Sequence, residues 1–266
     1  MCETVTNEIH SRVQWVRGDV IIIVLAAVVL TAASWAYLVH DVRSGHLGVP
    51  ACCELPDPRT WGVRELSILM IMWTVMMVGM MTPTVLPIML MVAALARQRK
   101  AAGRPYAGAF YFLTGYLIIW TAFSFIATLL QWGLHRVAWV SPEMTAGNRW
   151  FAGAVLIAAG VFQFTPMKNR CLTCCQSPID FLMTRWREGR MGAIKMGLEN
   201  GLLCAGCCWL LMLLLFVVGV MNLLWIAIIS VFVLLEKVSH KLPWIGQGAA
   251  IGLITWGIYV MSRATT

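Results

Sequence analysis

Charged side chains are scarce in this 266-residue chain, in which Asp, Glu, Lys and Arg make up 12% and hydrophobic residues 60%. A soluble globular domain carries about twice that charged fraction. Apolar runs of about 20 residues, the length that crosses the hydrocarbon layer of a bilayer, recur along the chain. The composition therefore excludes an ordinary soluble domain and predicts one integral membrane domain over residues 1–266, an all-α, multi-pass bundle of transmembrane helices in a lipid bilayer.

We expect no cleavable signal peptide, because the first apolar run begins only at Val20, is too long and has no small-residue cleavage site after it. No basic run is interleaved with aromatic residues, so the net charge of +8 does not indicate a nucleic-acid partner. Hydrolase triads, phosphate-binding loops and paired carboxylates with a clear site are missing as well. These absences favour a protein that is not an enzyme, without establishing it.

Seven apolar runs predict the transmembrane helices. They cover Val20–Val39, Leu66–Ala96, Tyr106–Gln131, Trp150–Thr165, Gly192–Val218, Asn222–Leu235 and Trp244–Met261. The sixth run is short and closely follows the fifth, so the alternative is six spans, with these two runs forming one broken element.

The distribution of basic residues predicts the orientation. With seven spans, 14 of the 20 Lys and Arg residues fall on the side of the amino terminus. Cytoplasmic loops carry the excess of basic residues. We therefore expect a bacterial inner (cytoplasmic) membrane protein with its amino terminus inside and its carboxyl terminus outside. The polar loop 168–190 is then cytoplasmic, and we expect short interfacial structure in it.

Cysteine is abundant, and most of the nine cysteines are clustered. The groups are Cys52 and Cys53 on the predicted outer side, Cys171, Cys174 and Cys175 in the inner loop, and Cys204, Cys207 and Cys208 in the fifth span, while Cys2 stands alone. The two larger groups repeat one Cys-x-x-Cys-Cys spacing. The cytoplasm keeps thiols reduced, so we expect the inner group to be free or metal-bound, whereas the outer pair can oxidise.

The fifth span places its thiols on one helix face. At about 100° per residue, its face holds Met196, Asn200, Cys204, Cys207 and Cys208 within an arc of about 120°. The three thiols lie roughly 13 to 20 Å beyond Lys195, near the middle of the bilayer. Sulfur ligands select soft ions, so this face predicts a buried Cu(I) site. The alternative is packing, because free cysteine behaves as a small buried apolar residue.

Two further features near this face have less specific interpretations. Met77 and Met81 share a stripe of the second span, and thioethers suit Cu(I), although methionine is more often a core filler. Pro83 and Pro87 predict a kink in that span, either a hinge or a static bend. The charges Glu199, Glu236 and Lys237 fall at inner span ends, and only Glu199 is expected near the thiol face.

Several segments together resemble a bacterial family of predicted metal-binding integral membrane proteins of unknown function. The resemblance covers about residues 73–237 and is carried by Trp73–Pro83, Lys168–Cys175, Gly201–Met212, Met221 with Asn222, and Glu236 with Lys237. It implies a metal-binding role without an established reaction. The family pattern implies a histidine before Gly201, where this chain has Asn200, so the site that remains is dominated by sulfur.

Three functions fit these observations. The first is a membrane protein that receives Cu(I) at Cys171, Cys174 and Cys175 and holds or passes it through Cys204, Cys207, Cys208 and nearby methionines, for delivery to a membrane cuproenzyme. The second is a non-catalytic subunit of a larger membrane complex, with contacts at small residues such as Gly246, Gly248 and Gly252. The third is a thiol–disulfide oxidoreductase that uses Cys204 and Cys207.

Overall fold

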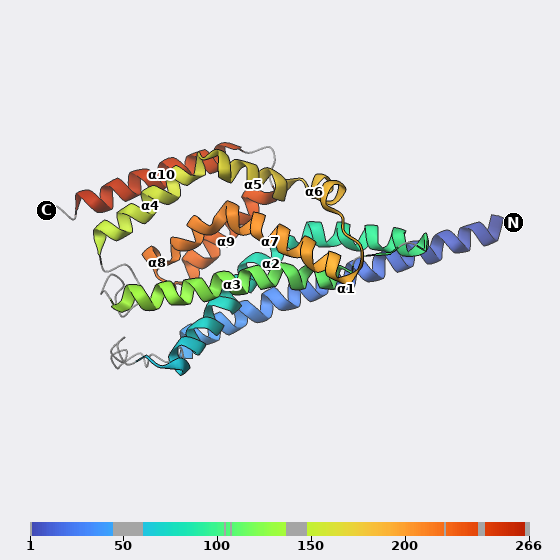
Figure 1. Ribbon diagram of the computed structural model, residues 1–266, viewed down its shortest axis with the longest axis horizontal. Coiled ribbons are helices and arrows are strands. Elements are labelled where there is room, and N and C mark those ends of the chain that lie inside the picture. Colours follow the sequence, from blue (N-terminus) through green and yellow to red (C-terminus); the bar gives the residue numbers. More distant parts are fainter. Residues whose placement is uncertain are drawn as a thin grey trace.

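The computed structural model describes residues 2–44, 61–103, 105–106, 108–136, 148–220, 222–238 and 243–263. Within these residues every regular element is a helix, which confirms the all-α class (Figure 1). The elements are α1 (Cys2–Ser44), α2 (Val63–Ala101), α3 (Ala109–Arg136), α4 (Arg149–Gln163), α5 (Pro166–Gln176), α6 (Pro178–Arg185), α7 (Gly189–Leu213), α8 (Leu215–Val218), α9 (Leu223–Val238) and α10 (Pro243–Ser262).

All seven predicted apolar runs are helical, and several are long enough to cross a membrane. Five segments meet that requirement within the described residues: Val20–Arg43, Val63–Ala101, Ala109–Arg136, Gly189–Val218 and Trp244–Ser262. Helices α4 and α5, bent by 62° to each other, supply a sixth if they act as one broken span. The remaining run, α9, has 16 residues. Seven full spans therefore stay a prediction.

The two chain ends lie at opposite ends of the bundle (Figure 1). An odd number of crossings leaves the termini in this arrangement. Which end faces the cytoplasm stays a prediction, and the predicted outer pair Cys52 and Cys53 lies outside the described residues.

The loop 168–190 contains the expected short structure, but part of it is buried. Pro166 begins α5, where its missing N–H is no loss, and the Thr165 hydroxyl caps the helix by accepting from the Lys168 backbone N–H at 3.3 Å. Pro178 begins α6 in the same way. Helix α5 then packs against α7 and α9. Helix α5 thus contacts the helix bundle, and its place at the membrane interface stays a prediction.

Glycines bring α3 and α7 into backbone contact. A Cβ atom at Gly197 of α7 would lie 2.0 Å from the Phe112 carbonyl oxygen, and one at Gly115 of α3 would lie 2.1 Å from the Ile194 carbonyl oxygen. Small residues allow such close approach of membrane helices. Tyr116 follows Gly115 directly, and its hydroxyl contacts Cys204 of α7 at 3.0 Å.

Glycines also join α4 to α10, through Gly153, Gly160 and Gly257. Contacts of Gly246, Gly248 and Gly252 with another subunit, which the sequence suggested as one alternative, stay a prediction. Gly248 and Gly252 face open space in the structure, and a Cβ at Gly246 would lie 3.0 Å from a Glu236 carboxylate oxygen.

Candidate metal site

The two Cys-x-x-Cys-Cys motifs lie side by side on α5 and α7. Helix α5 packs against α7. Cys171 lies over Gly206, where an added Cβ would be 3.1 Å from its Sγ. The sequence predicted one thiol group in a cytoplasmic loop and another in mid-membrane. The structure instead brings them together, because the bend between α4 and α5 turns α5 back onto α7.

Exposure of the thiols decreases from α5 to α7. Cys174 is exposed and Cys171 and Cys175 are half-buried, whereas Cys204, Cys207 and Cys208 are 2%, 2% and 1% exposed. These six cysteines, the ones whose side chains the structure describes, are all free thiols. The two motifs thus place thiols both at the surface and in the core.

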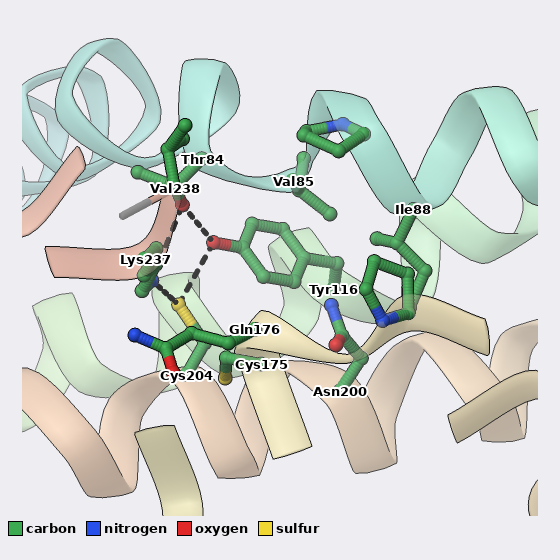
Figure 2. A pocket seen from close by; sticks show the side chains of 12 residues that line it. Thr84, Val85, Ile88, Tyr116, Cys175, Gln176, Asn200, Cys204, Lys237 and Val238 are labelled. Atoms are coloured by element: carbon green, nitrogen blue, oxygen red, sulfur yellow. Dashed lines mark hydrogen bonds between the residues drawn. The ribbon is translucent and has the colours of Figure 1, made fainter. Parts of the chain in front are cut away.

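Cys204 closes a ring of four polar side chains, which we call the Cys204 ring (Figure 2). Its Sγ lies 2.7 Å from the Lys237 Nζ and 3.0 Å from the Tyr116 hydroxyl. The Thr84 hydroxyl completes the ring, at 3.2 Å from the Lys237 Nζ and 3.3 Å from the Tyr116 hydroxyl. The four residues come from α7, α9, α3 and α2, so one hydrogen-bonded ring joins four helices.

A second buried charge lies beside this ring. The Lys168 ammonium of α5, 2% exposed, binds both carboxylate oxygens of Glu236 at 2.7 and 2.8 Å. The Gln176 amide donates to the Glu236 carbonyl at 2.6 Å. Glu199, which we expected near the thiols, instead pairs with Arg185 and Arg187 at 3.2 and 2.7 Å. The expectation for Glu199 was therefore wrong, and the charges beside the thiols are Lys237 and the Lys168–Glu236 pair.

A cavity of about 160 Å³ opens against the Cys204 ring. Its wall includes the four ring residues together with Cys175, Gln176 and Asn200. Figure 2 shows these side chains converging from helices above and below the cavity. Two thiols from different helices, Cys175 and Cys204, therefore face one space large enough for a metal ion.

A comparison with known families identifies the family of this chain. A family model described as PpoB2, copper chaperone, matches residues 70–260, well over half of the chain. The chain belongs to the PpoB2 copper-chaperone family. The matched region contains both cysteine motifs and all four residues of the Cys204 ring. No curated protein and no solved structure gives a comparable match.

Membership of the PpoB2 family supports copper as the metal that our sequence analysis expected, and thiols are the donor type that Cu(I) prefers. The described thiols do not surround one point in the structure. Cys207 and Cys208 each donate to the Cys204 carbonyl at 3.0 Å. In the described part of the chain, no three His, Cys, Asp or Glu side chains are arranged to hold a metal ion. A bound ion would have to replace these two hydrogen bonds.

The other predicted ligands occupy different surroundings. The Met196 sulfur accepts from the Arg187 backbone N–H at 3.3 Å, so it faces the start of α7 and not the thiols. Met77 and Met81 are fully buried, yet α2 lines the cavity with Thr84, Val85, Pro87 and Ile88. Met81 reaches the ring only through its carbonyl, which accepts from the Tyr116 hydroxyl at 3.3 Å. Asn200 lines the cavity, as its place on the thiol face suggested.

Three ring residues were not among the predicted ligands. Lys237 belongs to the Glu-Lys pair that carries the family resemblance, but its place at a helix end suggested a side chain that reaches toward solvent or forms an ion pair. Tyr116 and Thr84 gave no signal, since a lone tyrosine or threonine in an apolar run is common. Only the packing of four helices around one point reveals the part that they play.

Proposed function

We propose that this protein is an integral membrane copper chaperone that receives Cu(I) at the α5 thiols and holds it at the α7 thiols, for delivery to a membrane cuproenzyme. The observation that carries the proposal is the cavity that Cys175 of α5 and Cys204 of α7 line together, which links the two cysteine motifs. Cu(I) moves between thiolates by ligand exchange, and a new Cu–S bond forms most readily when the next sulfur is already adjacent.

The order of the thiols supports a direction of movement. Cys174 is exposed to a donor, Cys171 and Cys175 are half-buried, and the α7 thiols are almost completely buried. Each step inward exchanges solvent for protein surroundings, where a thiolate ligand neutralises the charge of the ion. The buried end is also shielded from competing solution ligands, which suits holding a toxic, redox-active ion.

The direct test is Cu(I) binding by the purified protein under reducing conditions, measured by competition with a chromophoric Cu(I) chelator. We expect about one tightly bound Cu(I) per chain and no comparable affinity for Mg²⁺ or Ca²⁺, which require oxygen ligands. The triple variant Cys204→Ser, Cys207→Ser, Cys208→Ser should lose this binding and remain folded, since serine is nearly isosteric and its hydroxyl can bond to helix carbonyls.

Cys2→Ser is the matched control, because it removes a thiol that belongs to neither motif. Its affinity should equal that of the wild type. Wild-type affinity and stoichiometry in the triple variant would refute the proposal and favour a structural subunit. Disulfide exchange by the same thiols, without copper binding, would favour the oxidoreductase.

A further inference from the structure

Lys237 carries a buried positive charge that has no carboxylate to balance it. The residue is 7% exposed, and its Nζ contacts the Cys204 sulfur and the Thr84 hydroxyl. Among the described residues no Asp or Glu forms an ion pair with it, and the adjacent Glu236 is already held by Lys168. An unbalanced charge in an apolar interior is costly. The residues therefore require negative charge at the sulfur site itself.

The surroundings of Lys237 leave sulfur as the source of that charge. The Lys168–Glu236 pair is neutral as a unit, and Thr84 and Asn200 carry no charge. The titratable and charged groups that face Lys237 from the helices packed around it are Tyr116 of α3, Lys168 and Cys175 of α5, Cys204, Cys207 and Cys208 of α7, and Glu236 of α9. Thiolates are the negative partners that remain when a metal is bound.

We infer that Lys237 is the fixed counter-charge of the copper site and determines its specificity, an inference that rests on the proposed function. A Cu(I) ion bound by two thiolates carries a net charge of −1, and the ammonium of Lys237 brings the assembly to zero. A divalent ion on the same two thiolates would leave a net charge of +1 in the apolar interior. Lys237 thus favours a monovalent ion over Zn²⁺, although Zn²⁺ also binds thiolates well.

The test compares Cu(I) and Zn²⁺ affinities of the full-length protein in detergent. Lys237→Met removes the charge, and we expect its Cu(I) affinity to fall about 10- to 100-fold, the range for loss of a charge-assisted contact. Its Zn²⁺ affinity should not fall, because Zn²⁺ with two thiolates is then neutral, so the ratio of Cu(I) to Zn²⁺ affinity decreases. Lys237→Arg keeps the charge and should restore the wild-type ratio. Lys195→Met, at an exposed position of α7, is the control and should change neither affinity.

Equal losses in Lys237→Met and Lys237→Arg, or an unchanged ratio in Lys237→Met, would overturn the inference. If Lys237→Met does not fold, X-ray absorption of the copper-loaded wild type gives the number of sulfur ligands on copper. Two thiolates leave a net charge of −1, which the Lys237 ammonium balances. Three thiolates leave −2 and would overturn the inference. The outcomes also separate the two proposals. A wild type that binds no Cu(I) refutes the proposed function. If Cu(I) binding depends on the thiols but its affinity does not change with the charge at position 237, only the inference about Lys237 is refuted.

Discussion

The sulfur of Cys204 has an ammonium and a phenol as neighbours, at 2.7 and 3.0 Å (Figure 2). Its backbone is engaged too, since its carbonyl accepts from Cys207 and Cys208. Buried polar groups in a low-dielectric interior hold one another firmly when all are satisfied. We therefore regard Cys204 as the residue that fixes the geometry of the site before copper arrives.

Tyr116 tests this view, because its hydroxyl contacts Cys204, Thr84 and the Met81 carbonyl. Tyr116→Phe keeps the aromatic side chain and removes these hydroxyl contacts. We expect the free energy of unfolding in detergent to fall by about 1–2 kcal/mol, the value of a buried hydrogen bond with its partners left in place. Thermal unfolding followed by circular dichroism measures the change.

Tyr106→Phe is the matched control, since Tyr106 is 46% exposed and its ring, which lies under the Lys100 ammonium, is kept. Its stability should stay within about 0.5 kcal/mol of the wild type. An equal loss in both variants would mean that the hydroxyl of Tyr116 adds nothing specific to the Cys204 ring.

Helix α5 shows where sequence reasoning succeeds and where it ends. Hydropathy located every long apolar helix, because such runs have no other stable state in lipid. The repeated cysteine spacing also identified both thiol groups. The sequence did not reveal that α5 turns back onto α7, because Lys168 and Arg170 made the segment look solvated. The partner that allows Lys168 to be buried, Glu236, lies 68 residues away.

The contact between α3 and α7 makes a prediction at the scale of helices. Gly197→Ala places a Cβ about 2.0 Å from the Phe112 carbonyl oxygen, so the two helices must separate. We expect a loss of about 3 kcal/mol or more in stability, the upper end for overpacking. Cu(I) affinity should fall as well, because Tyr116 and Cys204 lie on these two helices.

Gly252→Ala controls for the loss of a helix glycine, since its added Cβ meets open space in α10. There we expect no loss, or a gain of up to about 1 kcal/mol from the better helix former. Equal stability of the two variants, read from their melting curves, would mean that α3 and α7 do not depend on their close contact at Gly197.

For the whole molecule, the orientation is the open prediction. The basic residues predict that α5 and α6 lie on the cytoplasmic side and that the carboxyl terminus lies outside. In variants that keep a single cysteine, an impermeant maleimide added to spheroplasts should label Arg263→Cys and leave the exposed Cys174 unlabelled. Inverted vesicles should give the opposite pattern. Labelling of Cys174 from outside would reverse the topology and the direction of copper movement.

The Cys204 ring has a thermodynamic consequence that reaches beyond the metal. An ion that takes the Cys204 sulfur competes with the Tyr116 hydroxyl, and loss of that contact removes a link between α3 and α7. Copper occupancy and helix arrangement are then linked variables, and linkage is reciprocal. A partner that binds more strongly when this link between α3 and α7 is broken would tighten copper retention, while one that favours the intact Cys204 ring would weaken it and favour release. Through the same four side chains, a recipient protein that binds outside the bundle would control when copper is released without contacting the ion.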